Sequence, residues 1–85
     1  MDVRKIVGLN IRKARIDAGL SQEELAGRMD VEQFYISGLE AGRRNPTLVT
    51  LWKVAIALRV DVSVLLARGS QRPELPNKTK RSTKR

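Results

Sequence analysis

The 85-residue chain contains neither cysteine nor histidine. Without cysteine it can form neither a disulfide nor a thiolate metal site, and without histidine it lacks the commonest general base and metal ligand. It has one Trp, one Tyr and one Phe, whereas binders of single-stranded nucleic acid usually expose several aromatic rings. No combination of residues suggests catalysis, so we expect no enzyme, cofactor, metal or small-molecule ligand.

Long apolar runs are also missing. None approaches the roughly 20 residues that span a bilayer, and the N-terminus shows no signal-peptide pattern. We therefore expect a soluble cytoplasmic protein that makes no membrane contact. The length allows one domain with a modest core.

Basic residues are abundant, since 17 Lys and Arg face 9 Asp and Glu and give a net charge of +8. Residues 1–69 hold 11 basic against 8 acidic residues, and residues 70–85 hold 6 against 1. This excess predicts a polyanionic partner. Charge by itself fits RNA or a membrane surface almost as well as DNA.

The stretch from Ser21 to Glu40 organises the chain. Ser21 and Glu24 form an S-x-x-E capping box, which predicts a helix from about Gln22. Asp30 should end this helix, and Val31 should plug the turn that follows. A second helix is expected over residues 33–41. Two short helices separated by a tight turn make a helix-turn-helix unit.

The apolar residues of these two helices recur at helical spacing, as Leu25, Ala26 and Met29 and then Tyr35, Ile36 and Leu39. The opposite face of the second helix carries Gln33, Phe34, Ser37 and Gly38. These residues can hydrogen-bond or touch a base edge, and this face lacks the Lys/Glu pattern of a solvated helix. The alternative is the ordinary surface of a small helical bundle.

Sequence segments that follow one another in a characteristic order extend this pattern over nearly all of residues 6–66. They are Ile11–Arg15, Gly19–Ala26, Tyr35–Glu40, Gly42–Thr47 and Leu51–Leu58, followed by Val60. In order and spacing the chain resembles the phage-repressor and Cro-like helix-turn-helix family of transcriptional regulators. The YISGLE segment and the loop after it also resemble controller proteins of restriction–modification systems.

The resemblance implies roles for residues outside the reading face. An Arg at the position of Arg15 pairs in this family with the Glu that ends the recognition helix, here Glu40, and clamps the first helix to the third. If the resemblance is set aside, the two residues form an exposed ion pair that stabilises the fold by about 0–1 kcal/mol. By resemblance, Gln22 contacts a phosphate and braces Gln33. If the resemblance is set aside, Gln22 is simply a residue that favours helix in an exposed first turn.

The first turn of the recognition helix is expected in the major groove. The amide of Gln33 can bond bidentately to adenine, and Phe34 can contact a thymine methyl group or be buried in a dimer contact. Gly38 could permit close approach to DNA or simply be tolerated. Glu32 departs from the family pattern, in which a small hydroxyl residue caps this helix. It could accept from cytosine or select by repulsion.

A basic loop of Arg43, Arg44 and Asn45 follows, suited to clamping phosphate without reading sequence unless it is only solvated. The complete predicted DNA-binding set is Ser21, Gln22, Glu32, Gln33, Phe34, Tyr35, Ser37, Gly38, Arg43, Arg44 and Asn45.

Three further helices should support this unit. Asp2 can cap a first helix over residues 3–18, lined inside by Val7, Ile11 and Ala14 and ended at Gly19. Thr47 should cap a helix over residues 48–58. Its predicted apolar stripe is Leu48, Leu51, Trp52, Ala55 and Leu58, with Trp52 in the core or at its edge.

Val60 should plug the next turn, before a fifth helix over residues 62–67. The apolar residues of this helix exceed what one face can bury, which predicts a dimer interface; a tightly wrapped monomer is the alternative. The predicted interface residues are Val62, Val64, Leu65 and Leu66.

The sequence thus predicts an all-α, five-helix, lambda-repressor-like DNA-binding domain over residues 1–69 and a disordered basic tail over residues 70–85. The expected function is binding of double-stranded DNA at a palindromic or near-palindromic operator as a homodimeric transcriptional regulator. The alternatives are an antitoxin-type regulator of the same fold and a protein-interaction module that has lost DNA binding.

Overall fold

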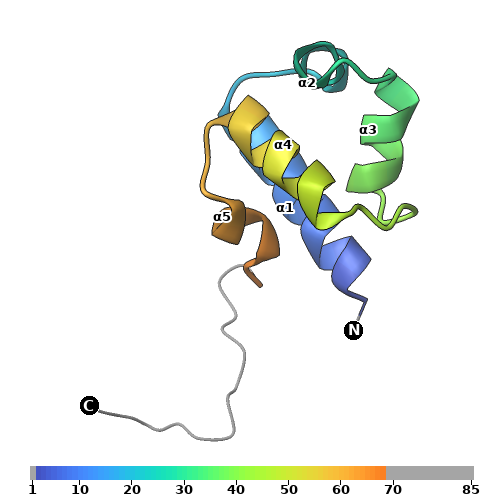
Figure 1. Ribbon diagram of the computed structural model, residues 1–85, viewed down its shortest axis with the longest axis vertical. Coiled ribbons are helices and arrows are strands. Elements are labelled where there is room, and N and C mark those ends of the chain that lie inside the picture. Colours follow the sequence, from blue (N-terminus) through green and yellow to red (C-terminus); the bar gives the residue numbers. More distant parts are fainter. Residues whose placement is uncertain (1, 69–85) are drawn as a thin grey trace, which may run out of the picture.

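Five helices follow one another in a computed structural model that describes residues 2–68 (Figure 1). No strand occurs within that range. The helices are α1 (Val3–Asp17), α2 (Gln22–Met29), α3 (Gln33–Glu40), α4 (Leu48–Leu58) and α5 (Val62–Leu66). The predicted all-α, five-helix fold is confirmed, with α1, α3 and α5 each ending one residue earlier than expected. The predicted tail, residues 70–85, lies outside the described residues.

Side-chain caps set the starts of α1, α2 and α4. Asp2 accepts a hydrogen bond from the Arg4 amide, and Thr47 accepts one from the Thr50 amide. Ser21 and Glu24 form both halves of the predicted capping box. The Ser21 amide donates to the Glu24 carboxylate and holds the pKa of that group below its usual value. The residue at which each of these helices begins is therefore determined by two or three neighbouring residues.

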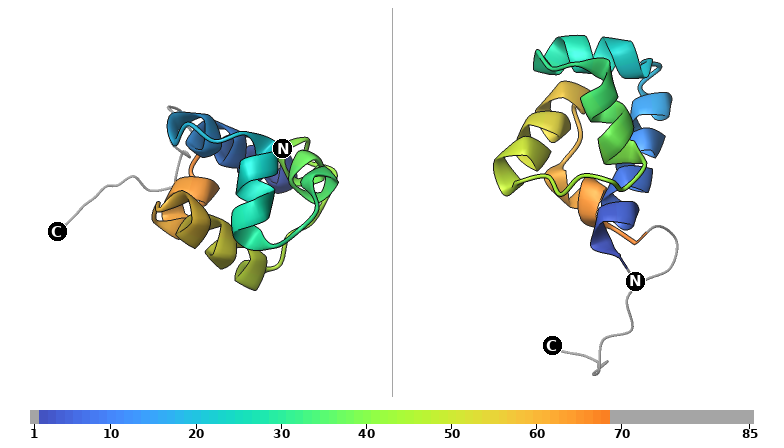
Figure 2. Two further views of the ribbon diagram at one scale, coloured as in Figure 1. Left: turned by 90° about the horizontal axis from the view of Figure 1, so that it is seen from above. Right: turned by 90° about the vertical axis from the view of Figure 1, so that its right-hand side faces the viewer.

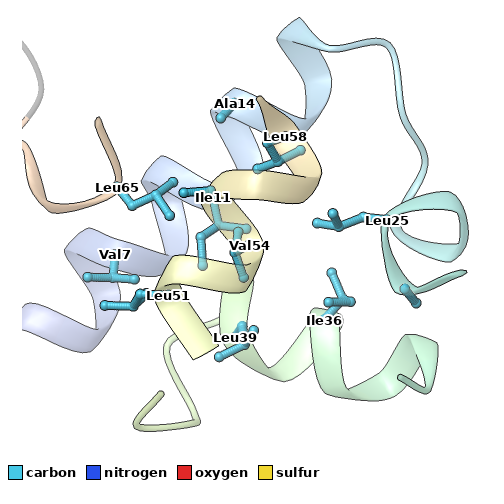
Figure 3. Close-up of a cluster of buried hydrophobic side chains, with 12 residues drawn as sticks. Val7, Ile11, Ala14, Leu25, Ile36, Leu39, Leu51, Val54, Leu58 and Leu65 are labelled. Carbon is cyan, nitrogen blue, oxygen red and sulfur yellow. The ribbon is translucent and has the colours of Figure 1, made fainter. Parts of the chain in front are cut away.

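The core lies where α4 crosses α1, and α2, α3 and α5 each add side chains to it (Figures 1 and 3). As predicted, α1 contributes Val7, Ile11 and Ala14, all at most 8% exposed. The other buried apolar residues are Leu25, Ala26, Ile36, Leu39, Leu51, Val54, Ala55, Leu58 and Leu65. Val31 and Val60, expected to plug turns, pack against this cluster.

The predicted stripe of α4 is wrong at two positions. Leu48 is 74% exposed and Trp52 is 59% exposed, whereas Val54, not included in the stripe, is fully buried. Only Thr50 and Lys53 are polar within this helix. An apolar pattern that surrounds the helix cannot specify which face turns inward, so packing against α1 and α2 made that choice.

Leu65 was assigned to a dimer interface, and this assignment is also wrong. Its side chain has no exposed surface because α5 packs on α1 and directs Leu65 into the core. The side-chain amide of Asn10 on α1 donates to the Leu65 carbonyl at 3.0 Å and also to the Ala67 carbonyl. Val64 and Leu66 are exposed, as a dimer contact requires, and Val62 is partly buried.

Helices α1 and α3 lie side by side (Figure 2) and come into close backbone contact at one point. The cause is Gly8, which faces the backbone of the last turn of α3. A Cβ atom at position 8 would lie 2.4 Å from the Leu39 carbonyl oxygen and 2.6 Å from that of Glu40. No side chain fits there unless the two helices separate.

Substitution of Gly8 should therefore destabilise the protein although alanine favours helix. We expect Gly8→Ala to lower the free energy of unfolding by about 1–3 kcal/mol, the usual cost of overpacking. Urea unfolding followed by circular dichroism measures this. Gly27→Ala is the matched control, because a Cβ atom there meets nothing within 4 Å, and it should stabilise by up to about 1 kcal/mol. Equal effects of the two substitutions would contradict the close contact.

Candidate nucleic-acid interface

The outer side of α3 is the centre of the candidate site. Ile36 and Leu39 are buried in the core, and Gln33 and Phe34 on the first turn point away from it. Phe34 is 65% exposed, as predicted. Gln33 is also exposed, and Ser37, one turn further along, is half-buried. The first turn of α3 therefore presents an amide and an aromatic ring to the surroundings.

A buried ion pair fixes the other end of this helix. Nε of Arg15 donates to Oε2 of Glu40 at 2.6 Å, and Nη2 donates to Oε1 at 3.0 Å. Nη1 of Arg15 donates to the Leu20 carbonyl at 2.8 Å. Arg15 and Glu40 are 9% and 8% exposed. The hydrogen bonds to Glu40 raise the pKa of Arg15 further above its ordinary value, so the guanidinium stays charged. The predicted contact between these two residues is confirmed.

A hydrogen-bonded series of side chains leads from this pair to the exposed first turn. Nε2 of Gln22 donates to Oε1 of Glu40 at 3.1 Å, and Nε2 of Gln33 donates to Oε1 of Gln22 at 3.4 Å. The predicted bracing of Gln33 by Gln22 is thus present, although the second contact is long. It links the orientation of an exposed amide to a buried carboxylate.

The loop between α3 and α4 places cations next to α3. Arg43, Arg44 and Asn45 are all exposed. The guanidinium carbon of Arg44 lies 5.0 Å from the ring centroid of Tyr35 and 5.6 Å from that of Phe34. A surface hollow of about 290 Å³ is lined by Phe34, Ser37, Gly38, Arg43 and Arg44.

Two predicted site residues differ from expectation. Gly38 was placed on the outward face, but it is buried beneath the side chain of Arg44. Glu32 occupies the N-cap position of α3, as its place in the sequence implies, but its carboxylate makes no capping hydrogen bond. It remains an exposed negative charge beside the first turn. The stacking of Arg44 on α3 was not predicted; two adjacent aromatic residues and a glycine one turn later are its only sequence signature.

The fold and this arrangement can be compared with known proteins. Residues 11–65 match the profile of the helix-turn-helix family. The chain belongs to this family. The expectation of a DNA-binding transcriptional regulator that is not an enzyme is confirmed by this membership. Within the described residues, no helix is long and apolar enough to cross a membrane.

Several helix-turn-helix proteins are similar along most of their length. The HTH-type transcriptional regulator y4dJ of Sinorhizobium fredii is 45% identical over 73 residues, which cover 86% of this chain and 95% of that protein. Control protein C.SmaI of Serratia marcescens is 39% identical over an aligned stretch that covers 87% of this chain and 88% of that protein. The crystal structure of the restriction–modification controller protein C.AhdI from Aeromonas hydrophila superposes with a TM-score of 0.70 at 37% identity. It covers 73% of this chain and 94% of that one.

Removal of one charge of the buried pair should be costly. We expect Arg15→Met to lower the free energy of unfolding by about 3 kcal/mol, because it leaves the carboxylate of Glu40 buried without its partner. The double variant Arg15→Met/Glu40→Leu should recover much of this loss, since it leaves no unpaired charge. Urea unfolding of the two variants and the wild type measures both effects. If the double variant were as unstable as Arg15→Met or less stable, the burial argument would fail.

Proposed function

We propose that this protein is a homodimer that binds a palindromic or near-palindromic operator in duplex DNA, with α3 in the major groove. The observation that carries the proposal is the contrast between the two ends of α3. Its last residue is locked in a buried ion pair, whereas its first turn is exposed beside three residues of a basic loop. A helix fixed at its last turn and exposed at its first turn suits groove reading, since the N-terminal residues of a recognition helix contact the base edges.

Each part of the exposed surface suits one kind of contact. Gln33 can donate to and accept from adenine, and Phe34 can cover a thymine methyl group. Arg43 and Asn45 suit phosphate oxygens, as does the N-terminus of α2 around Ser21 and Gln22. Glu32 either accepts from cytosine, which would favour G·C pairs at one position, or repels phosphates that approach too closely.

The dimer contact that we propose lies on α4 and α5. Leu48, Val49, Trp52 and Ile56 are each between 59% and 74% exposed, and they recur at helical spacing along one side of α4. Val64 and Leu66 of α5 are exposed as well. Large apolar patches are rare on monomers and mark interaction sites. A homodimer that reads two successive major grooves needs its two copies of α3 about 34–36 Å apart, which is one turn of DNA.

The reading role of α3 is tested by substituting both of its exposed first-turn residues. Duplexes are first selected from a random library with the wild type and sequenced. Gln33→Ala/Phe34→Ala should lose preference for the selected sequence, with roughly 1–3 kcal/mol lost per base contact. It should keep nonspecific binding with an unchanged dependence on salt, because neither substitution removes a charge.

Arg43→Ala is the matched control for that experiment. It should weaken binding to all duplexes alike and reduce the slope of log K against log[salt] by about 1. If the double variant selected the same sequence as the wild type, α3 would not be the reading element.

The dimer contact is tested at Trp52. Trp52→Glu should shift the protein from dimer to monomer in sedimentation equilibrium, since it puts a charge into an apolar contact, and should weaken operator binding at least tenfold. Arg12→Glu on the exposed side of α1 is the control and should leave the dimer intact. Trp52 is the only tryptophan, so a fluorescence change on dilution reports the same equilibrium. A wild type that is monomeric when bound to operator would refute the proposed dimer.

A further inference from the structure

The side chain of Arg44 is held against α3. It belongs to the loop after that helix, yet its guanidinium lies over the rings of Tyr35 and Phe34, and the stem of its side chain crosses Gly38. Neighbouring Arg43 is also exposed, but within the described residues no ion pair or aromatic contact involves it. Two adjacent arginines in one loop therefore differ in how firmly they are positioned.

Gly38 makes this position possible. A Cβ atom on residue 38 would lie 3.0 Å from Nε, 3.2 Å from Cγ and 3.3 Å from Cδ of Arg44. Each distance is shorter than normal van der Waals contact, so a side chain there would push Arg44 outward. Glycine also weakens the interior of a helix relative to alanine. Compared with alanine, glycine at position 38 therefore makes the helix less stable but leaves space for the side chain of Arg44.

We infer that Gly38 is a positioning residue for DNA binding: it forms a slot that holds Arg44 against Phe34 and Tyr35, ready to contact the duplex next to the bases that α3 reads. This inference rests on the proposed function. A guanidinium stacked on a ring face keeps its N–H edge available for a pair of acceptors. Those acceptors are phosphate oxygens or the O6 and N7 atoms of guanine. Because the side chain is already ordered, less conformational entropy is lost when it binds.

The test is a double-mutant cycle on the full chain with the selected operator duplex. Gly38→Ala should leave the unfolding temperature unchanged or raise it, yet weaken operator binding about fivefold, the scale of one cation–π contact. In an Arg44→Ala background the same substitution should have no further effect. Gly27→Ala, which also replaces a helical glycine but meets no neighbour, should leave affinity unchanged.

The four affinities distinguish the slot from a direct clash of the new methyl group with DNA. Unchanged affinity of Gly38→Ala would overturn the inference. An equal loss in the Arg44→Ala background would overturn it as well, because the methyl group would then act on DNA without Arg44. A wild type that bound no duplex would refute the proposed function and with it the role of Arg44. If the wild type bound the operator and Gly38→Ala bound it with the same affinity, only the slot would be refuted.

Two further measurements complete the experiment. In the NMR spectrum of the free protein, the Hε proton of Arg44 should be shifted upfield by the two rings and should move toward its ordinary position in Gly38→Ala. A wild-type resonance without this shift would overturn the slot independently of DNA. Arg44→Lys distinguishes the two acceptors: a uniform loss across duplexes identifies phosphate, and loss of preference at one base pair identifies guanine.

Discussion

The buried ion pair between Arg15 and Glu40 is the interaction on which the rest of the structure depends. Eight residues of helix are too few to be stable alone in water, so the direction of α3 is set by its tertiary contacts. The guanidinium of Arg15 holds the carboxylate of Glu40 with two hydrogen bonds and the Leu20 carbonyl with a third. It thereby connects α1, the loop before α2 and the end of α3 through a single planar group.

The same end of α3 is fixed a second time by its backbone. Gly8 lies against the carbonyl oxygens of Leu39 and Glu40, so α1 approaches α3 more closely there than any residue with a Cβ atom would allow. The ion pair limits rotation of α3, and the glycine contact sets its distance from α1. Buried charges are expensive unless they are fully hydrogen-bonded, and here the carboxylate also accepts from Gln22.

The molecule leaves much apolar surface uncovered for its size. One side of α4 and the ring of Phe34 are exposed, although the chain has few aromatic residues with which to build a core. Such exposure raises the risk of aggregation unless a partner covers the surface. On the proposed function, a second copy covers α4 and DNA covers Phe34, so the two exposed regions serve different contacts.

Features that depend on neighbouring residues were predictable from sequence. The caps at Asp2, Ser21 and Thr47, the glycine after α1 and the order of five helices all follow from local hydrogen bonding and backbone preference. The pairing of Arg15 with Glu40 was also anticipated, but through a family resemblance, because 25 residues separate the two and no periodicity relates them.

Only the tertiary structure decided which sides of the helices face inward and which distant side chains meet. Helix α4 is apolar almost all round, so its sequence is equally compatible with Trp52 or Val54 in the core, and packing selected Val54. Leu65 and Leu66 are identical neighbours of which one is buried, since a five-residue helix directs them apart. The slot between Gly38 and Arg44 joins a helix to the loop after it, and its existence depends on how that loop turns back.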